Sequence, residues 1–218
     1  MPLILHKDIE DGKIGLWKIT EELSELERLS RLSEPDLIAY SGISALHRKK
    51  EWLATRALLN ELTDEQTSIR YDNEGRPAPE NGKYNISISH TTGFVAVMLH
   101  DVLIPGIDIE LASRNIGRVA RRFLSPEEFE ECSHQTGISN EKLLLHWCAK
   151  EAIFKMVPFN NIEFSTDILI SLNENIQNSG LFAGVFKNHS DQISIPLEYI
   201  EECGVVMVWG LVDLTIFR

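Results

Sequence analysis

The chain alternates twice between helix-rich and β-rich segments, and this order constrains its fold more than any other feature. Residues 20–62 carry leucines at helical spacing, and residues 86–109 hold apolar β-forming runs separated by turn residues. A second helical pattern covers residues 125–156, and β-rich segments with Asn- and Gly-rich turns fill residues 164–217. The alternation predicts an α+β protein.

Two stretches of similar character indicate a repeated plan. Val205–Val208 and Val95–Met98 are both strongly β-forming, and each follows a helical region. We therefore expect two α/β halves of similar plan that meet near Pro105. The first half would comprise residues 1–104 and the second residues 105–218.

Three local signals refine this plan. Asn73–Pro77 is a turn signal, which predicts a short strand on either side. Ser125 followed three residues later by Glu128 is a capping box, which predicts the start of a helix. Asn140 is the expected cap of the next helix, which should end near Met156.

The charge of the chain excludes one class of partner. Its 218 residues include 21 Lys and Arg against 33 Asp and Glu, a formal net charge of −12. Nucleic-acid binding needs clustered positive charge, so we expect no nucleic-acid partner. Positive charge gathers only locally, at Arg48, Lys49 and Lys50 and at Arg114, Arg118, Arg121 and Arg122. The last four would share one face if that stretch is helical.

Hydropathy and cysteine usage bear on the compartment. No apolar run reaches the roughly 18 residues that a membrane span needs, so we expect no membrane partner. Met1–Asp8 holds too short an apolar stretch for a signal peptide. Cys132, Cys148 and Cys203 lie far apart without a CxxC spacing, which favours reduced thiols in a cytoplasmic protein.

Asp108 and Glu110 are the first candidate site residues. Side chains at i and i+2 of a strand share a face, so both carboxylates point the same way while Ile107 and Ile109 pack into the core. Paired oxygen ligands suit Mg²⁺, which commonly bridges to substrate phosphates. The alternative is a plain amphipathic strand with a wet outer face.

The predicted helix from Asn140 carries a second set of charges. Glu151 and Lys155 share one stripe, and Lys150 lies on the next. One interpretation is a surface pair that contributes about 0.2–0.5 kcal/mol. The other makes Glu151 a general base and the lysines phosphate partners.

Taken in order, five segments resemble a 4′-phosphopantetheinyl transferase of the larger, monomeric Sfp type. The resemblance spans roughly residues 70–157, and the GIDIE and WxxKEAxxK pair is its most specific part. The matching segments are Gly75–Pro77, Asn85–Thr91, Gly106–Glu110, Arg122–Glu128 and Trp147–Lys155.

The resemblance implies an activity and a fold. The phosphopantetheine arm of coenzyme A would be transferred to a serine of an acyl or peptidyl carrier protein, in a reaction that depends on Mg²⁺. Adenosine 3′,5′-bisphosphate would be released. The fold would be two pseudo-symmetric α/β halves of one monomer, with the active site in the cleft between them.

The resemblance also implies roles for particular residues. The metal ligands would be Asp108, Glu110 and, as the third acidic position, Glu128, which the capping box explains equally well. The catalytic set would be the base Glu151 and the cation Lys155, with Lys150 in the same motif. The coenzyme A ligands would be Arg76, Ser89, His90 and an N-terminal basic residue, with Lys50 preferred over Arg48, Lys49 and Arg56.

The chain departs from the family pattern in two places. The usual Asn-hydrophobic-Ser-His run is stretched to six residues, which leaves the family role of Asn85 open. Arg76 stands where lysine is more usual, which keeps the charge but changes its geometry. A catalytically lapsed binding module for coenzyme A or carrier protein is the main alternative function, and a metal-dependent phosphohydrolase acting on coenzyme A is another.

Overall fold

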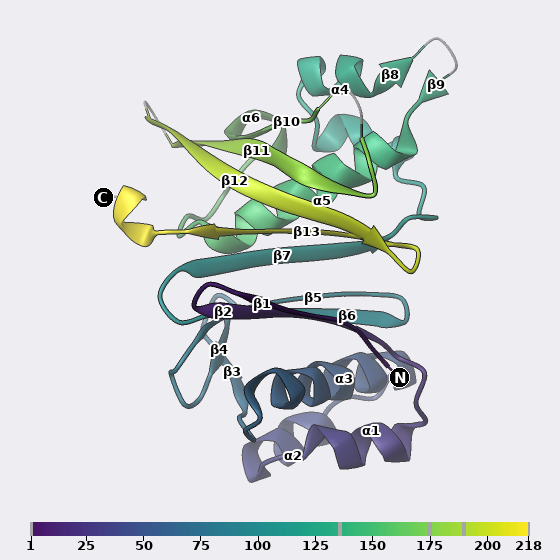
Figure 1. Ribbon diagram of the computed structural model, residues 1–218, viewed down its shortest axis with the longest axis vertical. Coiled ribbons are helices and arrows are strands. Elements are labelled where there is room, and N and C mark those ends of the chain that lie inside the picture. The colour runs from purple at the N-terminus through teal and green to yellow at the C-terminus, as the bar shows by residue number, and fades with distance from the viewer. Residues whose placement is uncertain (1, 135–136, 174–175, 189–190, 218) are drawn as a thin grey trace. The chain divides into compact units, whose positions relative to one another are not determined.

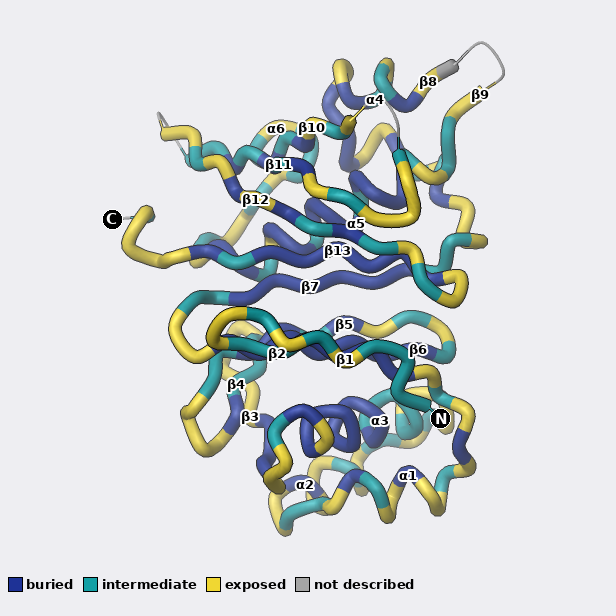
Figure 2. Tube along the Cα trace, in the orientation of Figure 1, coloured by how far each residue is buried: buried dark blue, intermediate teal, exposed yellow. Residues whose placement is uncertain are grey.

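The computed structural model describes residues 2–134, 137–173, 176–188 and 191–217. The chain forms two compact units, Met1–Leu103 and Ile104–Arg218. Each unit has its own sheet and its own hydrophobic core, as Figures 1 and 2 show. The chain therefore mixes helices and sheets in one α+β fold, as the sequence predicted. The predicted pseudo-symmetry of the two halves stays a prediction.

The first unit is built on a four-stranded antiparallel sheet. Its strand order is β1, β2, β6, β5, so the N-terminal hairpin pairs with a hairpin that follows the helices. The sequence analysis predicted no strand for the residues of this hairpin, Leu3–Ile9 and Gly12–Lys18. The strands are β1 (Leu3–Ile9), β2 (Gly12–Lys18), β5 (Asn85–Thr91) and β6 (Phe94–His100).

Three helices fill the segment predicted as helical in this unit. They are α1 (Leu23–Ser30), α2 (Glu34–Ser41) and α3 (Leu46–Thr63). Ser33 caps α2 and accepts a hydrogen bond from the Asp36 backbone N–H. A new helix therefore begins here, inside the segment that was predicted as helical. The long helix α3 buries a row of leucines against β2 and β6, and Figure 2 shows its dark, buried stretch.

The polar segment between α3 and β5 forms the predicted pair of short strands. They are β3 (Ile69–Tyr71) and β4 (Pro77–Pro79), which pair antiparallel around the turn that contains Gly75. Gly75 has a φ of 80°, a conformation that glycine adopts without the steric penalty of a side chain.

The second unit is built on a five-stranded antiparallel sheet. Its order is β10, β11, β12, β13, β7, so β7, the first strand of the unit, pairs with β13, the last. The predicted β-rich run of residues 86–109 is therefore divided between the two sheets. The strands are β7 (Ile104–Leu111), β10 (Ile168–Ser171), β11 (Ser179–Asn188), β12 (Asp191–Glu202) and β13 (Val205–Val212).

The helix α5 (Asn140–Met156) packs on one face of this sheet, chiefly against β7 and β13. Ser139 is its cap rather than the predicted Asn140, because the Ser139 hydroxyl accepts from the Lys142 backbone N–H. The capping box of Ser125 and Glu128 is confirmed. The other elements are the 3₁₀ helix η1 (Gly117–Arg122), α4 (Pro126–Cys132), β8 (Ser133–His134), β9 (Gly137–Ile138), α6 (Phe164–Asp167) and η2 (Leu214–Phe217).

Two further expectations concern the cysteines and membrane-spanning segments. All three cysteines are free: Cys132 and Cys148 are buried, and Cys203 is exposed. Among the residues that the structure describes, no helix is long and apolar enough to span a membrane.

Candidate active site

The strand β7 carries Asp108 and Glu110 on the face that α5 covers. Their side chains share a face, as predicted, but that face is buried: Asp108 is 7% exposed and Glu110 is 5% exposed. Ile107 and Ile109 lie on the opposite face and are also buried. The prediction that the two isoleucines are buried is confirmed, whereas the alternative of a wet outer face for the two carboxylates was wrong.

Lys155 of α5 makes direct contact with β7. Its Nζ donates to Asp108 Oδ1 at 2.8 Å and to the Ile107 carbonyl at 2.8 Å. Two motifs that are distant in the sequence therefore meet through an ion pair. The side chain of Lys155 remains 25% exposed, so part of it is open to solvent.

Glu151 lies one turn before Lys155 on α5, where its carboxylate is partly buried. Burial, and after it the negative charge of Asp108, raises the pKa of Glu151 to about 7, while Lys155 lowers it. The group is therefore able to take up or release a proton near neutral pH. This behaviour is unlike that of an ordinary surface glutamate.

Glu110 and Cys148 complete the surroundings of Asp108. Glu110 forms an ion pair with Arg114 and accepts from the Leu111 backbone N–H at 2.9 Å. Burial, followed by the charges of Asp108 and Glu110, raises the pKa of the Cys148 thiol well above its ordinary value. The buried Cys148 thiol therefore stays protonated and is not a candidate nucleophile.

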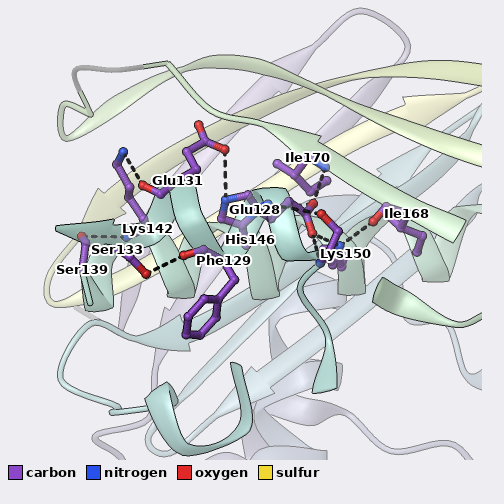
Figure 3. Close-up of polar contacts among 11 residues, drawn as sticks. Glu128, Phe129, Glu131, Ser133, Ser139, Lys142, His146, Lys150, Ile168 and Ile170 are labelled. Atoms are coloured by element: carbon purple, nitrogen blue, oxygen red, sulfur yellow. Dashed lines mark hydrogen bonds and ion pairs between the residues drawn. The ribbon is translucent and has the colours of Figure 1, made fainter. Parts of the chain in front are cut away.

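Glu128 is engaged in a different network, which Figure 3 shows. Its carboxylate accepts from the backbone N–H of Ser125 at 2.8 Å and of Ile170 at 2.7 Å, and from Lys150 Nζ at 2.7 Å. In the described parts of the chain, no three acidic, His or Cys side chains are grouped so that they could hold a metal ion. The structure thus does not join Glu128 to Asp108 and Glu110, and it supports the capping interpretation.

Lys150 lies in the interior, at 0% exposure. Its ammonium donates to Glu128, to the Phe164 carbonyl at 2.7 Å and to the Ile168 carbonyl at 2.5 Å. Three acceptors satisfy all three of its N–H groups, which leaves none for a substrate. The position of Lys150 therefore disagrees with a catalytic role and indicates a structural one.

His146 belongs to the same buried network. Its ring is 0% exposed, and neither ring nitrogen has a hydrogen-bond partner among the described residues. Nδ1 lies 3.6 Å from Glu128 and Nε2 lies 3.9 Å from Glu131. Figure 3 shows His146 between these two glutamates. Burial raises the pKa of Glu128, but the neighbouring His146 and Lys150 outweigh it, so the net pKa is lowered.

In the first unit, the structure places Arg48 beside His90. Arg48 Nη1 lies 2.7 Å from His90 Nε2 and 2.8 Å from Glu51. Both Arg48 and His90 are exposed, and the neighbouring Ser89 is buried. Arg48 is thus the N-terminal basic residue that accompanies a predicted coenzyme A ligand, a pairing that no sequence spacing could show.

The other N-terminal basic residues are engaged elsewhere. Lys50, the residue preferred from the sequence, donates to the Glu21 carbonyl at 2.8 Å. Arg56 is buried in an ion pair with Asp36 at 2.8 Å and lies over the ring of Trp52. Lys49 lies over the ring of Tyr40. Arg76 lies in the β3–β4 turn, where Glu74 is 3.4 Å away.

The arginines after β7 form an exposed basic segment. Arg118, Arg121 and Arg122 are exposed on η1, and Arg121 lies over the ring of Phe129 at 4.0 Å. Within the described residues these three arginines take part in no ion pair, whereas Arg114 is bound to Glu110. The four arginines predicted as one face therefore divide into one that neutralises a site carboxylate and three that face solvent.

Comparison with known families gives a match in the second unit. Residues 105–197 match the family model of the 4′-phosphopantetheinyl transferase superfamily. A search of curated proteins gave no match. The matched region contains β7, η1, α4 and α5, and with them Asp108, Glu110, Glu151 and Lys155. Residues 105–197 of the second unit are therefore similar to the 4′-phosphopantetheinyl transferase superfamily.

Proposed function

We propose that this protein transfers the 4′-phosphopantetheine arm of coenzyme A to a serine of an apo acyl or peptidyl carrier protein. The reaction would depend on Mg²⁺ and release adenosine 3′,5′-bisphosphate, in a cytoplasmic monomer of the Sfp type. The observation that carries the proposal is the cluster of Asp108, Lys155 and Glu151, in which the pKa of Glu151 is about 7. It lies in the region matched by the superfamily model.

The carboxylates fit a magnesium ion. Asp108 and Glu110 supply two hard oxygen donors on one face of β7, and the charge of Asp108 contributes to the raised pKa of Glu151. In the structure Lys155 and Arg114 neutralise these two carboxylates, so a bound magnesium ion would take over part of that positive charge. Mg²⁺ is commonly held by one or two carboxylates, with substrate phosphates and water filling the other positions. Bound to Asp108 and Glu110, it would supply charge neutralisation to a diphosphate.

The first unit supplies the candidate ligands for a phosphate group. Arg48 donates to His90 Nε2, so the remaining N–H groups of Arg48 and the Nδ1 of His90 are the candidate donors to a phosphate on this exposed surface. Ser89 and Arg76 keep the role that the resemblance implied. Lys50 is replaced by Arg48 in this assignment, because the Lys50 ammonium is already bonded to a carbonyl.

The positions of Glu151 and Lys155 on α5 support the following chemical step. Glu151 accepts the proton of the carrier serine, whose oxygen attacks the phosphorus of coenzyme A that bears the pantetheine arm. The bond from that phosphorus to the oxygen of the leaving bisphosphate breaks. Lys155 stabilises the negative charge that develops on the leaving group. Lys150 and Glu128 support the fold and take no part in this step.

The experiment is to incubate the protein with coenzyme A, Mg²⁺ and a panel of purified apo carrier proteins. Mass spectrometry should show a phosphopantetheine group on the carrier serine, together with free bisphosphate. Bisphosphate without a carrier would indicate the phosphohydrolase. Coenzyme A binding with no transfer to any carrier would indicate the lapsed binding module. Either result contradicts the proposal.

A further inference from the structure

The contact between α5 and β7 is closer than any side chain on Gly106 would allow. A Cβ at Gly106 would lie 2.2 Å from the Ala152 carbonyl oxygen and 2.5 Å from Met156 Cγ. Both distances are shorter than a Cβ atom makes to any non-bonded atom in proteins, so the helix packs directly on the backbone of the strand. The nearer obstacle is backbone and cannot rotate away.

Two further glycines extend this contact across the sheet. Gly210 of β13 pairs directly with Gly106, and a Cβ there would lie 2.7 Å from Leu197 Cδ2 and 2.8 Å from the Pro196 carbonyl of β12, and 3.3 Å from Met156 Cε of α5. A Cβ at Gly184 of β11 would lie 2.3 Å from Ile153 Cδ1. The second half of α5 therefore lies on a floor of three glycines: Gly106, Gly184 and Gly210.

Space, and not backbone conformation, requires glycine at these positions. Positive φ angles occur in this chain at other glycines, such as Gly75 and Gly204, but not at the three floor positions. All three lie inside strands, where glycine is otherwise unfavourable because it adds entropy to the unfolded chain. A close approach of another backbone is the usual reason for a glycine there.

The closest contact adjoins the candidate catalytic residues on both elements. Gly106 precedes Asp108 by two positions and shares its face of β7. On α5, Ala152 follows Glu151 and Met156 follows Lys155. The close contact at Gly106 therefore lies beside the ion pair in which Lys155 Nζ meets Asp108 Oδ1 at 2.8 Å.

We propose that Gly106, supported by Gly210 and Gly184, is a positioning residue that seats α5 at the distance needed for Glu151 and Lys155 to act with Asp108. The inference rests on the proposed transferase function. Adding a methyl group at Gly106 would shift α5 by on the order of 1 Å, a displacement that can lower catalysis about 100-fold.

The test compares Gly106→Ala with two matched controls. Gly12→Ala in the first unit meets a backbone carbonyl at a similar distance, Leu99 O at 2.4 Å, but far along the chain from the catalytic motifs. Gly180→Ala lies in the same sheet as Gly106 and meets only the ring of Tyr199, at 2.8 Å. Gly106→Ala should lower kcat about 100-fold with the KM for coenzyme A unchanged. The controls should lose thermal stability but keep kcat.

A rescue experiment separates side-chain from backbone obstruction. Gly184→Ala should lower kcat, because its methyl group would lie 2.3 Å from Ile153 Cδ1. Ile153→Val removes that atom and leaves Ile170 Cδ1 at 3.0 Å as the nearest contact, so it should restore kcat to Gly184→Ala. Met156→Ala should not restore kcat to Gly106→Ala, because the Ala152 carbonyl remains in the way. Recovery of Gly106→Ala by Met156→Ala would overturn the assignment of the backbone contact.

A readout without activity keeps this inference separate from the proposed function. A double-mutant cycle of Asp108→Asn and Lys155→Met, measured by chemical unfolding, should give a coupling energy in the wild-type background. In the Gly106→Ala background that coupling should disappear. The inference would be overturned if the coupling energy were retained in the Gly106→Ala background. It would also be overturned if Gly106→Ala lost no more kcat than Gly12→Ala and Gly180→Ala when all three lost Tm equally. Absence of transferase activity with loss of coupling would overturn only the proposed function.

Discussion

Glu151 is the residue at which burial and charge act against ionisation together. Its pKa in the folded protein is about 7, raised from an ordinary value of 4.5. The folded-state pKa of Glu151 lies above its unfolded-state value, so its contribution to the free energy of unfolding depends on pH. That contribution is fully present below about pH 4.5 and is lost as the pH rises through about 7. The same property that suits Glu151 to proton transfer therefore weakens the fold at alkaline pH.

We expect Glu151→Gln to abolish transfer and to stabilise the protein at pH 8. The gain should be on the order of 2–3 kcal/mol at pH 8 and should vanish at about pH 4.5, because the neutral amide avoids ionisation. Urea unfolding of wild type and variant across this pH range measures the difference. The control is Glu141→Gln, an exposed position on the same helix. A difference that does not change with pH would contradict the assignment of the pKa to Glu151.

Lys150 and Lys155 occupy successive turns of α5 but have opposite environments. Lys150→Met should destabilise the fold by about 3–5 kcal/mol, because it leaves the buried Glu128 carboxylate without its cation. Lys155→Met should destabilise the fold less than Lys150→Met, because the Lys155 side chain remains 25% exposed, and it should lower kcat. Chemical unfolding and steady-state kinetics of both variants measure the two effects.

The double variant Glu128→Gln with Lys150→Met provides the control for this pair. It should recover part of the lost stability, since no buried charge then remains unpaired. If Lys150→Met folded with a stability near that of wild type but lost much of its kcat, Lys150 would have the catalytic role that the sequence motif implied.

At the scale of elements, η1 presents arginines that take part in no ion pair among the described residues. A carrier protein with an acidic surface would be attracted to this element although the whole chain has a net charge of −12. Arg118→Glu with Arg121→Glu should raise the carrier KM about tenfold with little change in coenzyme A binding. Added salt should reduce the difference between wild type and variant.

The matched control for η1 is Arg28→Glu, an exposed arginine on α1. It changes the net charge in the same direction without changing the basic segment, so the carrier KM should stay near that of wild type. An unchanged carrier KM in the η1 variant, or an equal increase in the control, would remove η1 as a docking element.

At the scale of the whole molecule, the end of the first unit is held by two side chains. The amides of Val102 and Leu103 donate to His100 Nδ1 at 3.1 and 2.9 Å, and both of their carbonyls accept from Asn85 Nδ2 at 3.1 Å. Asn85 and His100 face each other across the β5–β6 ladder. The backbone is therefore held by side chains up to the residue before β7, which begins at Ile104.

We expect His100→Leu to accelerate hydrogen exchange of the Val102 and Leu103 amides by about tenfold or more, because it removes their acceptor. His100→Asn should largely preserve protection, since its side-chain oxygen can replace Nδ1 as acceptor. Mass-spectrometric exchange across this segment measures the effect. Equal protection in all three proteins would show that the side chain does not hold the segment.

The sequence alone was sufficient where the physics is local. The capping box joins Ser125 to Glu128 three residues away, and strand alternation places Asp108 and Glu110 on one face whatever surrounds them. The ordered motifs also identified the superfamily, which the match over residues 105–197 bears out.

Tertiary structure decided what periodicity leaves open. Alternation shows which residues share a face but not which face another element covers, because that depends on pairing between distant segments. Only the pairing of β7 with β13 and the seating of α5 buried Asp108 against Lys155. The same packing enclosed Lys150 among three acceptors, since helical position alone does not distinguish an interior lysine from one that reaches a ligand.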